Sequence, residues 1–161
     1  VFLELARGRD ETAMEIVPWA TVAENAVADW QREAEKKGLV LAWQDQSTTI
    51  PQVKSAFAES VIDNLLRNAL QYTERGQVTV VLTDYSLSVA DTGRGIADEE
   101  KTRVLQAFVR GDTAPGEGYG WGLSLVRRIC RKEGWVLSFV DNPPQGTIFT
   151  VTFRDKTTTL T

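Results

Sequence analysis

The feature that most constrains the fold is that helical and strand patterns interleave along the chain, while neighbouring strands are joined by short turns. Segment 77–85 alternates apolar and polar side chains, and segment 87–91 follows it after a tight turn. Segments 135–140 and 147–153 are also separated only by a turn. Strands joined this closely pair antiparallel, because a parallel crossover needs roughly a dozen residues or more. The pattern predicts an α/β two-layer sandwich with a mixed sheet, rather than a doubly wound parallel sheet.

Helical periodicity predicts the elements that cover this sheet. Segments 18–37 and 52–74 repeat apolar side chains at helical spacing, and segments 97–108 and 121–132 predict two further helices. A short apolar strand is expected at 39–43. With 161 residues, 42% of them hydrophobic, the chain suits a single domain whose core needs neither metal nor disulfide.

Residue counts exclude several classes of function. The chain contains no histidine, which removes Ser-His-Asp and Cys-His catalysis and HExxH zinc sites. Cys130 is the only cysteine, so no internal disulfide forms and a reducing compartment is favoured. The net charge of −4 argues against a general nucleic-acid binder. No apolar run approaches the roughly 18 residues needed to span a bilayer.

Polar and aromatic side chains share one side of the helix predicted at 52–74. Asn64 and Asn68 are four residues apart. Gln71 and Tyr72 follow three and four residues after Asn68. Asparagine is a poor former of helix interiors, so two on one stripe need an explanation. An amide oxygen can ligate Mg²⁺, which prefers oxygen donors. A solvated polar face is the alternative interpretation of this segment on its own.

A second candidate lies at the end of a predicted strand, in the sequence VADTGRGI (89–96). Asp91 leaves the buried strand just before Gly93 and Gly95, which places a carboxylate in a crevice beside exposed backbone. A carboxylate there can accept a hydrogen bond from an exocyclic amine such as that of adenine. An ordinary Asp-Thr-Gly turn is the alternative.

The segment GEGYGWGLSLV (116–126) is a glycine-rich loop that runs directly into a predicted helix. Free backbone N–H groups and the positive end of the helix make such a junction a site for anions. The chain contains neither Gly-Lys-Ser/Thr nor GxGxxG, so this is not a Walker A loop or a dinucleotide fingerprint. Just before it, Arg110 in AFVRGD (107–112) could bind a terminal phosphate as a bidentate cation. A flexible hinge and a solvated arginine are the alternatives.

Taken in order, these four segments resemble the N, G1, F and G2 boxes of the catalytic, ATP-binding domain of sensor histidine kinases, in the GHKL superfamily. The closing segment QGTIFTVTF (145–153) also resembles the terminal strand of that family. The resemblance implies a Bergerat-type ATP-binding fold, with a mixed five-stranded sheet packed against three helices. It further implies protein histidine kinase activity in a two-component phosphorelay, with ATP and Mg²⁺ bound.

The binding residues of the family map onto this sequence position by position. Asn68 matches the asparagine that ligates Mg²⁺, Asn64 the first N-box asparagine near the phosphates, and Arg110 the F-box arginine; these carry the implied catalytic role. Asp91 matches the carboxylate that reads the adenine amino group, and Tyr72 the aromatic ring beside the nucleotide. The full set of implied nucleotide-binding residues is Asn64, Asn68, Gln71, Tyr72, Asp91, Gly93, Gly95, Ile96, Arg110, Gly118, Tyr119, Gly120, Trp121, Gly122, Leu123 and Thr147.

The sequence departs from the family pattern at several positions. Gln71 stands where many relatives have Lys, Arg or His facing the phosphates. Leu105 and Ala107 replace the usual first phenylalanine and proline of the F box, which predicts a differently packed lid. Trp121 replaces a leucine between the last two glycines of the G2 box, and KEGW (132–135) lacks a histidine common in the family. None of these changes removes the metal-binding asparagine or the base-reading carboxylate.

The resemblance also implies a domain organisation and a set of partners. Residues 1–13 resemble the end of a dimerisation hairpin and a linker, and residues 14–154 resemble the catalytic domain; residues 155–161 are expected to form a disordered tail. The implied partners are the histidine-bearing dimerisation domain of a homodimeric parent kinase and a cognate response regulator. Neither nucleic acid nor direct membrane contact is expected for this fragment. The expected location is cytoplasmic, with the parent protein anchored in the bacterial inner membrane.

Three other functions remain open. A hydrolytic GHKL ATPase activates water with a glutamate one helical turn before the metal-binding asparagine; here that position is Asn64, which cannot act as a general base. A serine kinase or anti-sigma relative would share the same pocket. A pseudokinase that only binds nucleotide is the remaining alternative, which Gln71 and the altered F box keep open.

Overall fold

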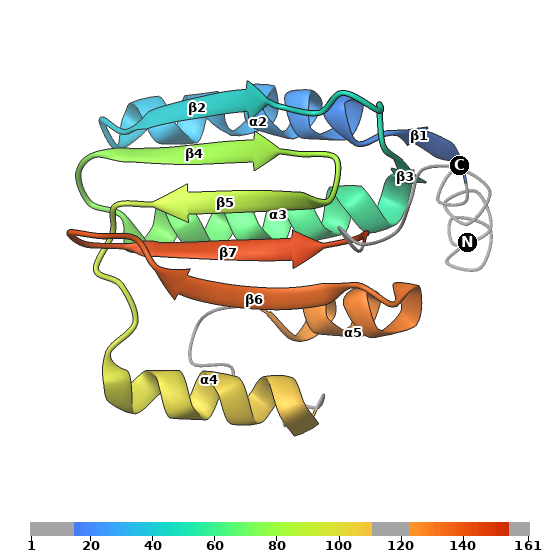
Figure 1. Cartoon of the computed structure of the whole chain (residues 1–161). Coiled ribbons are helices and arrows are strands. Elements are labelled where there is room, and N and C mark those ends of the chain that lie inside the picture. Colours follow the sequence, from blue (N-terminus) through green and yellow to red (C-terminus); the bar gives the residue numbers. More distant parts are fainter. Residues whose placement is uncertain (1–14, 111–122, 155–161) are drawn as a thin grey trace, which may run out of the picture.

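The centre of the molecule is a five-stranded sheet formed by β2 (Val40–Asp45), β4 (Gln77–Leu82), β5 (Ser86–Asp91), β7 (Thr147–Thr152) and β6 (Val136–Asp141), in that order (Figure 1). The computed structural model describes residues 15–110 and 123–154. β2 lies parallel to β4, whereas β4 with β5, β5 with β7 and β7 with β6 pair antiparallel. The predicted mixed sheet and both predicted hairpins are therefore confirmed.

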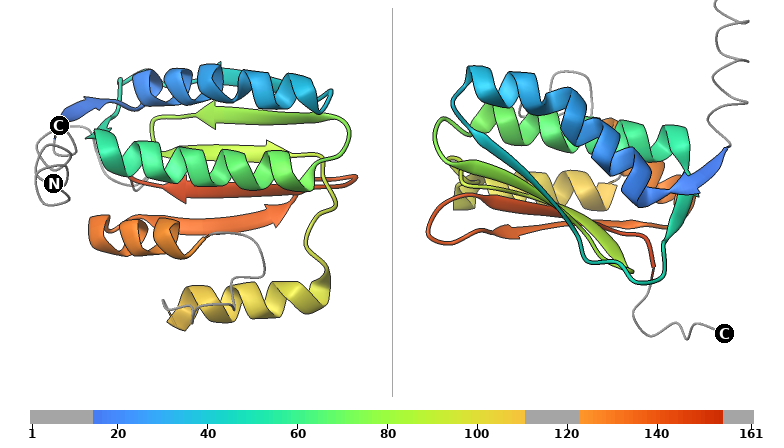
Figure 2. Two further views of the ribbon diagram at one scale, coloured as in Figure 1. Left: turned by 180° about the vertical axis from the view of Figure 1, so that it is seen from behind. Right: turned by 90° about the horizontal axis from the view of Figure 1, so that it is seen from above.

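The helices form one layer over a single face of this sheet. α2 (Trp19–Lys36), α3 (Ser55–Tyr72) and α5 (Ser124–Glu133) lie side by side on that face (Figure 2). α4 (Asp98–Arg110) lies beyond β6, at the edge of the sheet (Figure 1). The predicted two-layer sandwich with a sheet packed against three helices is confirmed. Within the described part of the chain, no helix combines the length and the apolar character that a membrane crossing requires.

The core forms where the strand pattern meets the helix pattern. Along β4, Val78 and Val80 are fully buried, whereas Thr79 between them is half-buried on the open face. On α3, Ile62 and Leu66 likewise have no exposed surface. Strand side chains alternate between the two faces of the sheet, and helix side chains on one face recur every three to four residues. The apolar face of the sheet and the apolar faces of the helices therefore pack against each other and form the core. Burying each large apolar side chain stabilises the fold by roughly 1.5–3 kcal/mol.

A short two-stranded ribbon is the main difference from the sequence-based expectation. β1 (Ile16–Pro18) and β3 (Gln52–Lys54) pair antiparallel, with Val17 opposite Val53. The helix expected from Gln52 therefore begins at Ser55, because the preceding residues take part in this pairing. Strands of three residues are too short to show a period, and only the tertiary contact reveals them.

Candidate functional site

Asp91, the last residue of the central strand β5, is buried where that strand ends, with 4% of its surface exposed. One carboxylate oxygen, Oδ1, accepts hydrogen bonds from the backbone N–H groups of Gly93 (2.9 Å) and Thr147 (3.2 Å). No group within the described residues donates to the other oxygen, Oδ2. The fold thus brings three sequence-predicted residues together, and Oδ2 is available to a donor from outside the chain.

The environment of Asp91 determines which ligands it favours. Burial raises the pKa of Asp91, and the hydrogen bonds from the Gly93 and Thr147 N–H groups oppose this shift only in part. A buried charged oxygen without a donor is costly. The ionised carboxylate therefore favours a ligand that presents a hydrogen-bond donor, and it repels a carbonyl oxygen.

The turn between β6 and β7 holds the backbone of Asp91 in place. The side chain of Asn142 donates a hydrogen bond to the Asp91 carbonyl oxygen (2.7 Å), and the Asn142 N–H donates to the Gly146 carbonyl oxygen (3.0 Å). Gly146 adopts φ +125°, which disfavours any other residue. The sequence-predicted site omits both residues. The glycine directly before Thr147 is a recognisable signal, whereas Asn142 acts through a tertiary contact that no local pattern indicates.

The polar residues predicted on one side of α3 lie in different environments. Asn68 is 3% exposed, so it does not belong to a solvated face. Asn64, one turn earlier, is half-buried, and its Nδ2 donates to the Ser60 carbonyl oxygen (2.7 Å). Gln71 is exposed near the end of the helix. The buried amide of Asn68 is therefore the strongest candidate on α3 for contact with a ligand.

The C-terminal end of α3 is tied to the loop that follows Asp91. The Arg94 N–H donates to the Tyr72 carbonyl oxygen (3.3 Å), and the Arg94 guanidinium lies 4.6 Å from the centre of the Tyr72 ring. Gly93 packs against the same carbonyl, since a Cβ atom at Gly93 would lie 2.3 Å from it. These contacts satisfy part of a helix end whose last carbonyl groups have no partner within the helix. The two motifs predicted separately, on the helix and on the loop, therefore form one unit.

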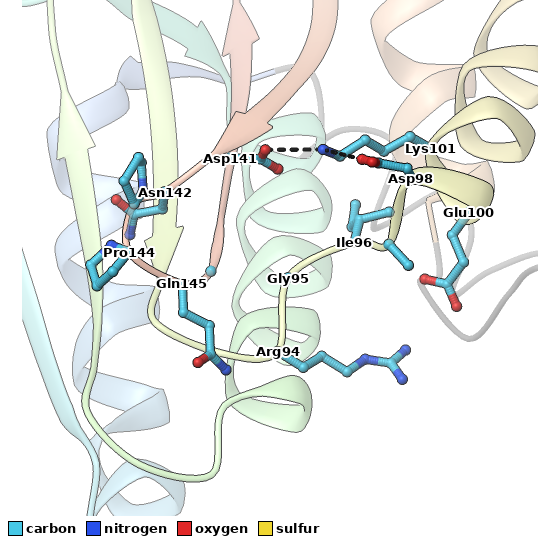
Figure 3. Close-up of a pocket in the computed structure, with 13 residues that line it drawn as sticks. Arg94, Gly95, Ile96, Asp98, Glu100, Lys101, Asp141, Asn142, Pro144 and Gln145 are labelled. Atoms are coloured by element: carbon cyan, nitrogen blue, oxygen red, sulfur yellow. Dashed lines mark hydrogen bonds and ion pairs between the residues drawn. The ribbon is translucent and has the colours of Figure 1, made fainter.

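Two hollows flank this loop, and both are large enough for a small organic ligand. The first has a volume of about 560 Å³ and lies at the end of α3. The second, of about 570 Å³, lies between the loop, the start of α4 and the β6–β7 turn, where Lys101 pairs with Asp141 (2.9 Å) at its rim (Figure 3). Predicted site residues line both hollows: Gln71, Tyr72 and Gly93 the first, and Gly95 and Ile96 the second.

Two hydroxyl groups near Asp91 are buried and lack a hydrogen-bond partner among the described residues. They are Oγ1 of Thr147, which is 1% exposed, and Oγ1 of Thr73, which has no exposed surface. A buried polar group without a partner costs roughly 1–3 kcal/mol. Such a pair indicates a site that a ligand or a bound water completes. Thr147 belongs to the sequence-predicted set, whereas Thr73 does not.

Metal binding at this site would depend on few protein atoms. Among the described residues, no group of three or more histidine, cysteine or acidic side chains could hold a metal ion. Mg²⁺ in phosphate sites usually takes one or two protein ligands and completes its shell with phosphate oxygens and water. The buried amide of Asn68 fits that kind of site.

Several predicted residues lie at or beyond the ends of the described segments. Arg110 is the last residue of α4. Leu123 directly precedes α5, is 7% exposed, and accepts a hydrogen bond from the Arg127 N–H (2.9 Å). Ile96 is buried just before α4, whereas Leu105 on α4 is 53% exposed. The predicted residues that lie outside the described part of the chain are Gly118, Tyr119, Gly120, Trp121 and Gly122.

Residues 53–157 match the family model described as histidine kinase-, DNA gyrase B-, and HSP90-like ATPase. The chain is 34% identical over 132 residues to the adaptive-response sensory kinase SasA of Rippkaea orientalis, which covers 76% of this chain and 34% of that protein. It is 33% identical over 116 residues to the sensor protein kinase PmrB of Pseudomonas aeruginosa, with 68% and 24% covered. The chain thus spans about a third or less of the length of these relatives.

Solved structures of similar fold include the catalytic domain of the histidine kinase ThkA, with a TM-score of 0.71 and 19% identity over 85% of this chain and 92% of that chain. Full-length ShkA in complex with AMPPNP has a TM-score of 0.67 and 24% identity, covering 86% of this chain and 31% of that chain. At these identities the likeness shows the fold alone.

Proposed function

Because the chain belongs to the family of histidine kinase-, DNA gyrase B- and HSP90-like ATPases, we propose that it is the ATP-binding catalytic domain of a two-component sensor histidine kinase. The named relatives SasA and PmrB are sensor kinases, which supports this choice within the family. The observation that carries the proposal is the environment of Asp91, whose buried carboxylate keeps one oxygen available to a donor.

The groups around the Asp91 carboxylate fit the edge of an adenine base. Adenine presents an exocyclic amino group that donates to a carboxylate, whereas guanine presents a carbonyl oxygen at that position. The backbone N–H of Thr147 donates to the same carboxylate, and the Thr147 hydroxyl has no hydrogen-bond partner among the described residues. The base or an intervening water would supply that partner. Gly93 adds no side chain that would obstruct the approach of a flat ring.

The phosphates would lie along α3. The amide oxygen of Asn68 would hold Mg²⁺, which neutralises phosphate charge when it is bound. Asn64 would lie near the phosphates, and Gln71 would supply a neutral contact where many family members have a cation. Arg110 and the glycine-rich segment after it, outside the described residues, would complete the phosphate contacts.

The environment of Asn64 supports a kinase over a dedicated hydrolase. A hydrolase of this superfamily needs a general base one turn before the metal-binding residue, and an amide cannot accept the proton. The Asn64 Nδ2 is also engaged with the Ser60 carbonyl oxygen (2.7 Å) and its Oδ1 accepts from Arg67 (3.4 Å). Water activation at this position is therefore disfavoured on both counts.

The phosphoryl acceptor would be a histidine on another domain, because this sequence contains none. In the proposed reaction the histidine belongs to the dimerisation domain of a homodimeric parent kinase, and the phosphoryl group then passes to an aspartate of a response regulator. The proposal includes a parent protein anchored in the bacterial inner membrane, with this domain on the cytoplasmic side.

The test is phosphoryl transfer in trans. The chain is mixed with labelled ATP, Mg²⁺ and a separately expressed histidine-bearing hairpin domain. We expect slow, concentration-dependent labelling with acid-labile, base-stable phosphate, because the missing tether removes a large effective concentration. Asn68→Ala should abolish transfer, whereas the control Asn25→Ala, on the exposed face of α2, should leave it unchanged.

Two results would contradict the proposal. Binding of ATP with no transfer to the hairpin would favour a pseudokinase. Release of free phosphate at a rate independent of the hairpin would favour a hydrolase.

A further inference from the structure

The hydroxyl group of Thr73 has no role in the site described so far. Thr73 directly follows α3 in an extended conformation and has no exposed surface. Its Oγ1 has no hydrogen-bond partner within the described residues. Because a buried unpaired hydroxyl is costly, a partner from outside the protein chain is expected here.

The hydroxyl lies against the loop that positions Asp91. A Cβ atom built on Gly93 would lie 2.9 Å from Thr73 Oγ1, so the hydroxyl packs directly against Gly93. The Gly93 N–H in turn donates to Asp91 Oδ1 (2.9 Å), as does the Thr147 N–H (3.2 Å). Thr73 is therefore one contact away from a residue that holds the carboxylate.

A second buried hydroxyl belongs to a residue in contact with Asp91, since the Thr147 N–H donates to the Asp91 carboxylate. Within the described part of the chain, the hydroxyls of both Thr73 and Thr147 are buried and have no hydrogen-bond partner. Two hydroxyls and a carboxylate oxygen supply the two to four polar partners that a buried water requires.

We propose that Thr73 is a positioning residue for base recognition, whose hydroxyl binds a buried water that also donates to the Asp91 carboxylate and keeps it directed at the adenine amino group. A water that bridges two protein groups is nearly as favourable as a direct hydrogen bond. Thr73 thus acts through Asp91 and not on the nucleotide itself. This inference rests on the proposed adenine recognition.

The test compares near-isosteric variants by calorimetric titration of the whole chain with ADP. Thr73→Val removes the hydroxyl and keeps the shape, so we expect ADP binding about tenfold weaker, in line with one hydrogen bond to a charged group. Thr73→Ser keeps the hydroxyl and should bind ADP as the unmodified chain does. The control Thr79→Val, on the open face of β4, should leave ADP binding unchanged.

Two further measurements separate positioning from a structural role. The purine riboside analogue of ADP lacks the amino group, so the unmodified chain and Thr73→Val should bind it with equal affinity. The melting temperature of ligand-free Thr73→Val should fall by only a few degrees, because the substitution removes one water-mediated hydrogen bond and keeps the packing.

The outcomes distinguish this inference from the proposed function. If the unmodified chain does not bind ADP, both are overturned. If it binds ADP and Thr73→Val binds equally well, or loses affinity for the analogue as much as for ADP, the positioning role alone is overturned. A variant that melts at a markedly lower temperature or fails to fold overturns it too, since the hydroxyl would then stabilise the fold directly.

Discussion

A Cβ atom on Gly146 would lie 2.0 Å from the backbone carbonyl oxygen of Asp91. Gly146 precedes β7 and Asp91 ends β5, so two neighbouring strands meet here through a contact that admits no side chain. The φ of +125° at Gly146 is also a conformation that other residues rarely adopt. The position of the Asp91 carboxylate therefore depends on the absence of a side chain at Gly146.

We expect Gly146→Ala to lower the free energy of unfolding by about 2–4 kcal/mol, because strain and a backbone clash add together. The displaced turn should also weaken ADP binding. The matched control is Gly38→Ala, where φ is +72° but nothing lies within 4 Å of the added Cβ, so only about 1 kcal/mol is expected. Urea denaturation measures both values. Equal losses would show that the contact with Asp91 contributes nothing.

Asp91→Asn should raise the melting temperature of the ligand-free protein at pH 7. Burial raises the pKa of Asp91 in the folded chain, so folding favours the protonated form. The stability from this group is present below its unfolded-state pKa and is lost as the pH rises through the higher folded-state pKa. The gain from the substitution should therefore shrink as the pH falls toward about 4. A lower melting temperature for the variant at pH 7 would contradict this.

The same Asp91→Asn variant should bind ADP more weakly by about 2–3 kcal/mol, because a charged acceptor is lost from a buried site. Its preference for ADP over GDP should fall as well, since the amide can donate to the guanine carbonyl oxygen. Titration calorimetry with both nucleotides measures this, and Asp29→Asn, on the exposed face of α2, is the control. Unchanged ADP affinity would exclude Asp91 as the base-reading group.

Gln71→Lys should tighten the binding of ATP more than that of adenosine. Charge-assisted hydrogen bonds are roughly twice as strong as neutral ones, so a lysine facing the phosphates should act only on the charged ligand. Gln145→Lys is the control, because Gln145 lines the same hollow from the β6–β7 turn. Equal effects of Gln71→Lys on both ligands would show that this position does not face the phosphates.

The thiol of Cys130 should be unreactive in the folded protein. Burial on α5 raises the pKa of Cys130 to about 12, and the thiolate is the reactive form. At pH 8, alkylation by iodoacetamide should be at least about 100-fold slower than in urea. Because Cys130 is the only cysteine, mass spectrometry of the whole chain follows the reaction. Rapid labelling without denaturant would contradict the burial.

Local patterns predicted the fold well where an element was long enough to show its period. The hairpin β4–β5 and the helix α3 are examples, because alternation and helical spacing are properties of a single segment. The ribbon of β1 and β3 went unpredicted for the opposite reason. Each strand has three residues, and pairing with a distant segment is what makes it a strand.

The sequence by itself determined the residue types of the candidate site and their order, from Asn68 on the helix to Asp91 before the glycines and Thr147 on the last strand. These are local signals, since each depends on neighbours within a few positions. Only the tertiary structure decided that Asn142 and Gly146 hold the backbone of Asp91. Hydrogen bonds and close contacts between residues far apart along the chain form only when the sheet brings its strands together, so no local pattern encodes them.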